Sequence, residues 1–180
     1  MALAALLGVA TAAASTPAIG GSSSRQVVRN CTTAELKIKS FHKGAALGNV
    51  GGYIGFTDRV SRPCRLSGWP TLVAITAAGS AKTAVHRRST MFGPRPTIKG
   101  VPVVTLRHGE RADAVFAGSD IAGPGQTRCP PPYRYLRVTP PRNDGSVRLS
   151  AWITGLNAYL PACAPISVTF VVSASQLNHG

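Results

Sequence analysis

The chain has 180 residues, enough for one domain and an N-terminal extension. Apolar residues make up 44% of it, which supports a substantial core, whereas 19 glycines and 14 prolines predict frequent turns and exclude a fold built from long helices. Twenty basic residues against six acidic ones give a formal charge of +14, so most basic side chains must face solvent.

The first residues form an apolar, alanine-rich run that ends in small residues. Such a run is typical of a signal peptide, is too short to span a membrane, and predicts cleavage near residues 14–20. A Gly- and Ser-rich leader follows. We therefore expect a signal peptide and leader over residues 1–30, a domain over 31–175 and a tail over 176–180, in a protein that is secreted or located in the cell envelope.

Four widely separated cysteines follow the leader, Cys31, Cys64, Cys129 and Cys163. They form no C-x-x-C pair, so neither a zinc site nor a redox motif is expected. An even number behind an export signal indicates two disulfides formed in an oxidising compartment. Of three connectivities, the even spacing favours Cys31–Cys64 and Cys129–Cys163, each worth roughly 3–4 kcal/mol in the chain-entropy model. Arg29 does not fit a lipobox, so we expect no lipid on Cys31.

From Leu36 onward, apolar and polar residues alternate with a period of two, which is typical of half-buried strands, and Gly- and Pro-rich runs separate these segments. The expected strands cover residues 36–41, 50–57, 72–76, 101–106, 111–117, 135–139, 147–153 and 166–173. We expect 101–106 and 111–117 to form a hairpin. We also expect 135–139 and 147–153 to be joined by a tight turn around Asn143-Asp144-Gly145.

No segment shows a sustained 3.6-residue period. Seven to nine short strands with regular turns predict an all-β fold, an antiparallel Ig-like β-sandwich held by two disulfides. Trp69 should pack at a corner beside Cys64. The core should contain the large apolar residues Ile54, Phe56, Leu66, Leu72, Leu149, Phe170 and Val172.

Candidate catalytic and metal-binding residues are few. His108, Glu110 and Asp113 are of types that bind metals, but we interpret them as a polar hairpin tip, because Glu110 and Asp113 would point to different faces of a sheet. The sequence has no G-x-S-x-G elbow and no Gly-rich phosphate loop. We therefore expect no enzymatic activity, no metal and no cofactor, and a hydrolase is the least favoured function.

One stretch carries a more specific pattern. Cys64 begins the sequence C-x-L-x-G-W-P, which ends at Pro70, and it follows Cys31 by about thirty residues. Together with the other two cysteines and the segments 136–141 and 163–172, this element resembles a family of secreted actinobacterial domains, the domain of unknown function DUF4232. The resemblance covers nearly the whole chain beyond residue 30. It implies a secreted or envelope-attached β-sandwich with no established activity.

The excess of arginine suggests a binding function, because guanidinium groups bind phosphate, sulfate and carboxylate bidentately. One basic pair, Arg87 and Arg88, lies in an expected loop, and a second group lies between residues 134 and 148. If 135–139 and 147–153 pair directly, one outer face carries two flat rings and two guanidinium groups. These residues are Tyr135, Arg137, Arg148 and Trp152.

We therefore predict a non-catalytic domain that binds an anionic envelope glycan or lipid, or another envelope protein, through this face. Nucleic acid is not expected, because the protein is exported and carries no recognisable nucleic-acid-binding motif. The alternative is a purely structural or accessory envelope domain whose charge only keeps it soluble. The sequence leaves the oligomeric state open.

Overall fold

The structure is a computed structural model that describes residues 27–94 and 97–177. The predicted signal peptide, most of the leader and residues 178–180 of the predicted tail lie outside these residues. No helix in the described part of the chain has the length and apolarity needed to cross a membrane.

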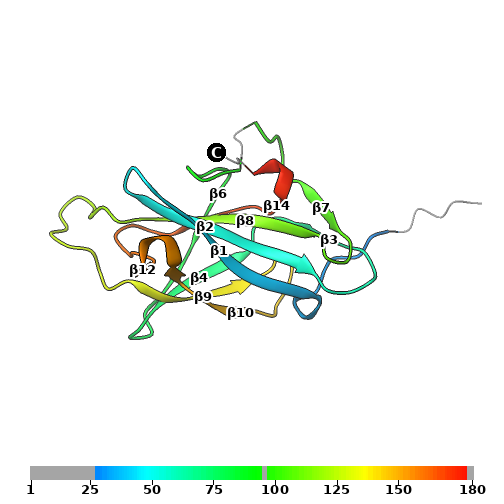
Figure 1. The fold of residues 1–180 in the computed structure, drawn as a ribbon, viewed down its shortest axis with the longest axis horizontal. Coiled ribbons are helices and arrows are strands. Elements are labelled where there is room, and N and C mark those ends of the chain that lie inside the picture. Colours follow the sequence, from blue (N-terminus) through cyan, green and yellow to red (C-terminus); the bar gives the residue numbers. More distant parts are fainter. Residues whose placement is uncertain (1–26, 95–96, 178–180) are drawn as a thin grey trace, which may run out of the picture.

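The larger sheet is built around three long strands that run side by side (Figure 1). Its neighbours are antiparallel except for the parallel pair β13–β6. Its order is β1 (Leu36–Ala46), β2 (Asn49–Asp58), β8 (Arg111–Ser119), β13 (Ser167–Thr169) and β6 (Val85–Arg87), with β14 (Val172–Ser173) also paired to β8.

The second sheet has four strands in the order β10 (Val147–Ser150), β9 (Tyr133–Thr139), β4 (Thr71–Thr76) and β5 (Ala81–Thr83). Two-stranded sheets join β3 (Cys64–Ser67) to β7 (Val103–Leu106) and β11 (Trp152–Ile153) to β12 (Ala158–Tyr159). The helical turns are η1 (Thr33–Glu35), η2 (Thr154–Leu156) and η3 (Ala174–Gln176).

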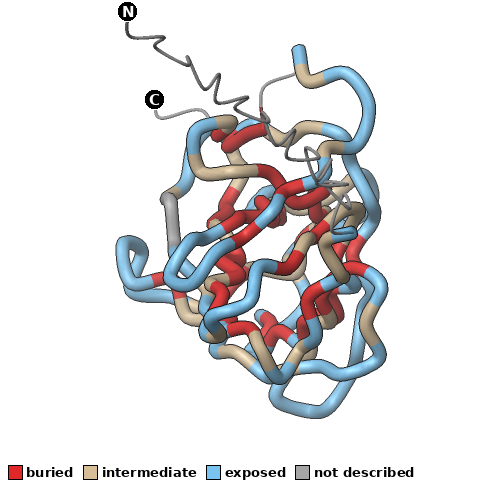
Figure 2. Tube along the Cα trace, turned by 90° about the vertical axis from the view of Figure 1, so that its right-hand side faces the viewer, coloured by how far each residue is buried: buried red, intermediate tan, exposed pale blue. Residues whose placement is uncertain are grey.

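The two larger sheets enclose the main hydrophobic core, and buried residues line the strands in Figure 2. Strand β8 is buried on both faces: Ala114 and Phe116 belong to the main core, whereas Val115 and Ala117 belong to a second cluster. This second cluster covers the outer face of the larger sheet and comprises Phe92, Val115, Ala117, Phe170, Val172 and Leu177. Leu177 is 2% exposed, so the packed domain continues to this residue.

The all-β, antiparallel-rich class and both predicted disulfides are confirmed. Cys31 bonds to Cys64 and Cys129 bonds to Cys163, with Cα–Cα distances of 4.8 and 4.5 Å. The strands are more numerous than expected, and several extend beyond their expected ranges: β1 continues to Ala46 and β8 continues to Ser119. The expected strand 147–153 divides at Ala151 into β10 and β11, and the expected strand 166–173 divides into β13 and β14.

The predicted hairpin between 101–106 and 111–117 is wrong. Strand β7 pairs with β3, not with β8. The start of β8 is already paired on both edges, with β2 through Thr57 opposite Arg111 and with β14 through Ser173 opposite Ala112. No edge of β8 is left there for β7.

The alternation of residues 166–173, with Val168 and Phe170 inward, predicts that Thr169 faces outward, but Thr169 is fully buried. Its hydroxyl accepts a hydrogen bond from the backbone N–H of Val115 and donates one to the carbonyl of Phe170, so its polar group is satisfied inside the fold. The chain between β13 and β14 changes face here, with Val171 in the main core and Phe170 in the second cluster.

Six of the seven predicted core residues are fully buried, and Leu149 is the exception. It is only partly buried because β10 is the edge strand of its sheet. Trp69 was expected beside Cys64, but it packs against the second cluster, whereas Cys64 belongs to the main core. The Trp69 ring meets Phe170 edge-on at 5.5 Å and stacks on His86 at 5.6 Å.

Candidate functional site

The outer face of the four-stranded sheet carries the predicted binding residues. Strands β9 and β10 pair directly, and Arg148 lies opposite Arg137 in the register. Leu136 and Val138 are buried, so the alternation of a strand turns Tyr135 and Arg137 away from the core. The direct pairing on which the predicted face depends is therefore present, and it places both arginines on one face.

Contacts between guanidinium groups and rings organise this face. The Cζ atom of Arg148 lies 3.5 Å from the centre of the Tyr135 ring. The Cζ atom of Arg134 lies 4.0 Å from the centre of the Tyr159 ring. Such contacts contribute about 0.5–1 kcal/mol each at exposed sites.

Trp152 joins the face indirectly. It belongs to the small β11–β12 sheet, where it lies opposite Tyr159, and the two rings meet edge-on at 4.8 Å. Tyr159 in turn contacts Arg134, which precedes Tyr135 in the chain. We call the resulting surface the arginine–aromatic face; it comprises Arg134, Tyr135, Arg137, Arg148, Trp152 and Tyr159.

Strand β9 carries an irregularity that adds Arg134 to this face. Its register against β4 shifts between Ile75 and Thr76, which lie opposite Tyr135 and Tyr133. Arg134 is the extra residue between them, and it is exposed whereas Tyr133 is buried. Burial raises the pKa of the Tyr133 hydroxyl.

No carboxylate among the described residues forms an ion pair with the arginine–aromatic face. Ion pairs within residues 27–94 and 97–177 join Arg29 to Glu35, Arg107 to Glu110 and Arg111 to Asp113. None of these residues belongs to the face. Its guanidinium groups contact rings instead, and a ring contact leaves the N–H donors in the guanidinium plane available to an anion.

Sequence reasoning missed Tyr159 as a member of this face. Its strand has two residues and shows no alternation, and it follows Asn157, which adopts a left-handed conformation with φ of 48°. Tyr159 lies far from Arg134 in the chain, so the contact between them is not visible in the sequence. The pairing of β11 with β12 brings Tyr159 beside Arg134.

Two of the other candidate residues, Arg88 and Asp113, have structural partners. Arg88 donates two hydrogen bonds to the carbonyls of Ile98 and Gly100 and thereby holds the 88–100 loop. Asp113 is fully buried and forms an ion pair with Arg111. No group of three or more His, Cys, Asp or Glu side chains in the described segments could hold a metal ion.

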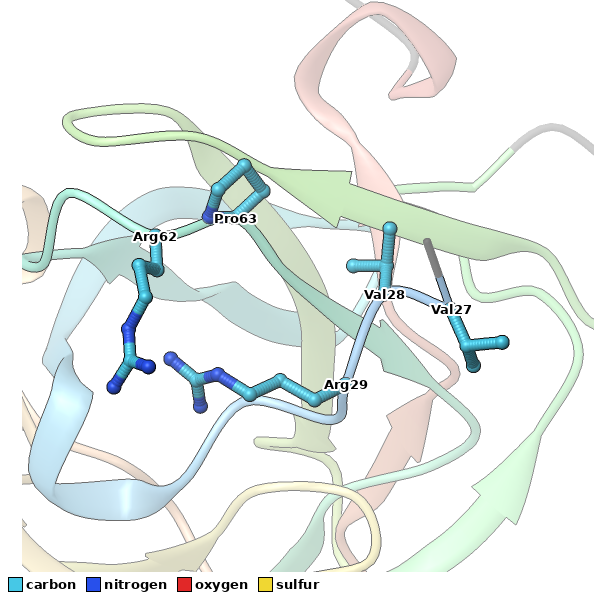
Figure 3. Close-up of a pocket in the computed structure, with 5 residues that line it drawn as sticks. All are labelled: Val27, Val28, Arg29, Arg62 and Pro63. Carbon is cyan, nitrogen blue, oxygen red and sulfur yellow. The ribbon is translucent and has the colours of Figure 1, made fainter. Parts of the chain in front are cut away.

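A hollow of about 240 Å³ lies between the end of the leader and the segment before β3, lined by Val27, Val28, Arg29, Arg62 and Pro63. Figure 3 shows the guanidinium groups of Arg29 and Arg62 directed toward one another. Arg29 is engaged by Glu35, whose carboxylate it contacts at 2.6 Å. This contact lowers the pKa of Glu35 to about 2.

The comparisons with known proteins identify one family. A family model described as a domain of unknown function (DUF4232) matches residues 31–171. No curated protein and no solved structure matches the chain.

Proposed function

The chain belongs to the DUF4232 family of domains of unknown function, and from this premise we propose that it is an extracytoplasmic, non-catalytic β-sandwich that binds an anionic component of the cell envelope through the arginine–aromatic face. The location is supported by the two disulfides, which form in oxidising compartments. The predicted signal peptide is consistent with it.

The observation that carries the proposal is the placement of Arg137 directly opposite Arg148. Side chains at directly opposite positions of an antiparallel pair have Cβ atoms about 4.5–5.5 Å apart, and like charges there are destabilising. No carboxylate of the described chain lies between them to offset the repulsion. A bound anion would do so.

The geometry favours a sulfated or phosphorylated glycan. Two guanidinium groups on one face can each hold an oxyanion bidentately, and Trp152, whose ring meets Tyr159 edge-on, offers a ring against which a sugar can pack. The tyrosine beneath Arg148 restricts that side chain before any ligand arrives. Less ordering is then required on binding.

The proposal is tested by retention on purified cell wall and on immobilised dextran sulfate, with uncharged dextran as the control matrix. We expect Arg137→Glu/Arg148→Glu to reduce retention at least about tenfold, because it removes both bidentate donors and adds two negative charges. Retention of the parent protein should fall steeply between low and high salt.

The matched control is Lys37→Glu/Lys39→Glu, which changes the net charge by the same amount on exposed positions of β1. If both double variants lose retention equally, only the total charge matters and the face is no specific site. If the arginine variant binds as the parent does, the domain is accessory and its charge serves solubility. The melting temperature should stay nearly constant in both variants, because all four side chains are exposed.

A further inference from the structure

The two-residue loop between β1 and β2 places a leucine where the backbone favours glycine or asparagine. Leu47 has φ of 50° and Gly48 has φ of 75°. Two positive φ values in a two-residue hairpin loop mark a type I′ turn, in which Asn-Gly is the usual sequence. The Leu47 side chain is also 86% exposed, so no burial within the fold compensates for the strained backbone.

Two further apolar side chains are exposed at the same end of the molecule. Ile121 is 60% exposed, and its Cδ1 atom occupies the position that a Cβ on Gly48 would take. The Ser119 hydroxyl donates to the Gly48 carbonyl at 2.9 Å and holds the two loops together. Leu156 is 40% exposed in η2, which contacts β1. We call Leu47, Ile121 and Leu156 the hairpin end, and Figure 1 shows the loops that carry them at one end of the fold.

Most of the acidic residues lie at the opposite end. Strand β1 has eleven residues and is therefore roughly 36 Å long. Glu35 precedes it and Asp58 lies opposite its first residue, Leu36. The Asp58 N–H donates to the carbonyl of Glu110, and Asp144 follows Asn143, which is bonded to Thr33 in η1. Asp113 lies within β8. Among the described residues, Asp120 is then the one acidic residue at the hairpin end.

Basic residues outnumber this one acidic residue at the hairpin end. Strand β9 ends toward Asn143 at the opposite end of the fold, so its first residues, including exposed Arg134, lie toward the hairpin end. The loop between β8 and β9 begins beside Gly48 and carries exposed Arg128. Lys82, also exposed, lines a hollow with Pro130 and Tyr133 where β9 begins.

We propose that the hairpin end docks on an anionic lipid surface, with Leu47 and Ile121 entering the headgroup region and the neighbouring basic residues contacting the headgroups. Apolar side chains on separate protruding loops can enter a fluid interface one by one, whereas a protein partner requires a continuous, complementary patch. Arg128, Arg134 and Lys82 supply the charge complementarity to anionic lipid. The docking surface is distinct from the arginine–aromatic face, with which it shares only Arg134.

The first test is flotation of the full chain with vesicles of phosphatidylglycerol and phosphatidylcholine, compared with phosphatidylcholine alone. Leu47→Asn/Ile121→Ser should reduce the fraction bound to anionic vesicles roughly tenfold, because two inserting side chains are lost. The control Met91→Ser/Val103→Ser removes side chains that are 50% and 59% exposed elsewhere, and it should bind as the parent does.

The single variant Leu47→Asn separates docking from folding, because asparagine tolerates the left-handed conformation. Its melting temperature should rise by about 2–4 °C while its binding to anionic vesicles falls. A variant that binds less because it is unfolded would melt at a lower temperature. A higher melting temperature together with weaker vesicle binding is therefore expected only under the proposal.

The second test shows directly which part of the protein enters the membrane. It therefore also detects binding through any other part of the chain. A tryptophan is introduced as Leu47→Trp or, as the control, as Val103→Trp, and its quenching by brominated acyl chains is measured. Stronger quenching at position 47 supports the proposal. The proposal is overturned by equal quenching at the two positions or by unchanged flotation of the Leu47→Asn/Ile121→Ser variant. It is also overturned if the parent protein binds uncharged vesicles equally well, or binds neither kind of vesicle.

Discussion

The side chain of Asn143 connects two parts of the chain that are 110 residues apart, and its removal should be costly. Its Oδ1 atom accepts hydrogen bonds from the backbone N–H of Thr33 at 2.8 Å and from the Thr33 hydroxyl at 3.2 Å. Its Nδ2 atom donates to the carbonyls of Cys31 at 2.9 Å and Pro141 at 3.0 Å. It therefore fastens the β9–β10 connection to the segment that carries the first disulfide.

A net contribution of about 0.5–1.5 kcal/mol per hydrogen bond gives a cost of roughly 2–5 kcal/mol for Asn143→Ala, with the weaker contact counted at the lower limit. This value corresponds to a fall in melting temperature of about 4–20 °C for a domain of this size. Urea unfolding followed by far-UV circular dichroism measures the free energy directly, provided that the m-value is unchanged.

Asn49→Ala is the matched control, because its Nδ2 atom makes one exposed hydrogen bond, to the carbonyl of Leu47. We expect it to cost about 1 kcal/mol or less. If Asn143→Ala is no more destabilising than this control, the β9–β10 connection is held by the sheet alone. The argument from the four hydrogen bonds would then be refuted.

Two further predictions concern the second cluster and the first helical turn. Trp69→Ala should destabilise by about 2–4 kcal/mol in urea unfolding, because the half-buried ring packs on Phe170 and His86, and an unchanged midpoint would contradict this packing. The Arg29 guanidinium lowers the pKa of Glu35 from 4.5 to about 2, so its stabilisation is complete above pH 4.5 and is lost as the pH falls toward 2. Glu35→Gln should flatten the dependence of melting temperature on pH in that window, and a pH profile identical to the parent's would show that another carboxylate controls it.

The pairing of β9 with β10 could be predicted because the local pattern contains all that determines it. Leu136, Val138 and Leu149 mark the inward positions, and the connection between the strands contains the turn-forming residues around Asn143. A shift by one residue would turn the inward positions to solvent, so the register is strongly specified. Arg137 and Arg148 then follow on the outer face.

The pairing of β7 could not be predicted in this way. Its proximity in the chain to β8 suggested a hairpin, but the choice of partner depends on β2 and β14, which come from distant parts of the sequence. The burial of Thr169 has the same origin, because a polar residue of an alternating strand need not face solvent when distant segments cover both faces of that strand. Short strands such as β12 carry too few residues for any period to be read.

The two sheets differ in how their outer faces are covered, and this difference decides where a binding surface can form. The larger sheet buries its outer face under the second cluster, to which Phe92 contributes from the 88–102 loop and Leu177 from the segment after η3. Figure 1 shows β9 and β10 along the margin of the fold away from η3. The outer face of the four-stranded sheet is thus left to solvent, although Val73 lies within it and is only 9% exposed.

That burial is explained by the side chains around it. Val73 lies opposite Arg137 on β9, and long arginine side chains can cover apolar surface with their methylene groups while their charged ends stay in water. Arg137 can therefore shield the sheet as well as present charge, while Arg148 stacks on Tyr135. A lysine at either position would do less, since its ammonium is more strongly hydrated and is not planar. An edge-to-edge contact of this sheet with another copy is opposed by the same charges. These properties of the face are the reason that we propose an anion as its ligand.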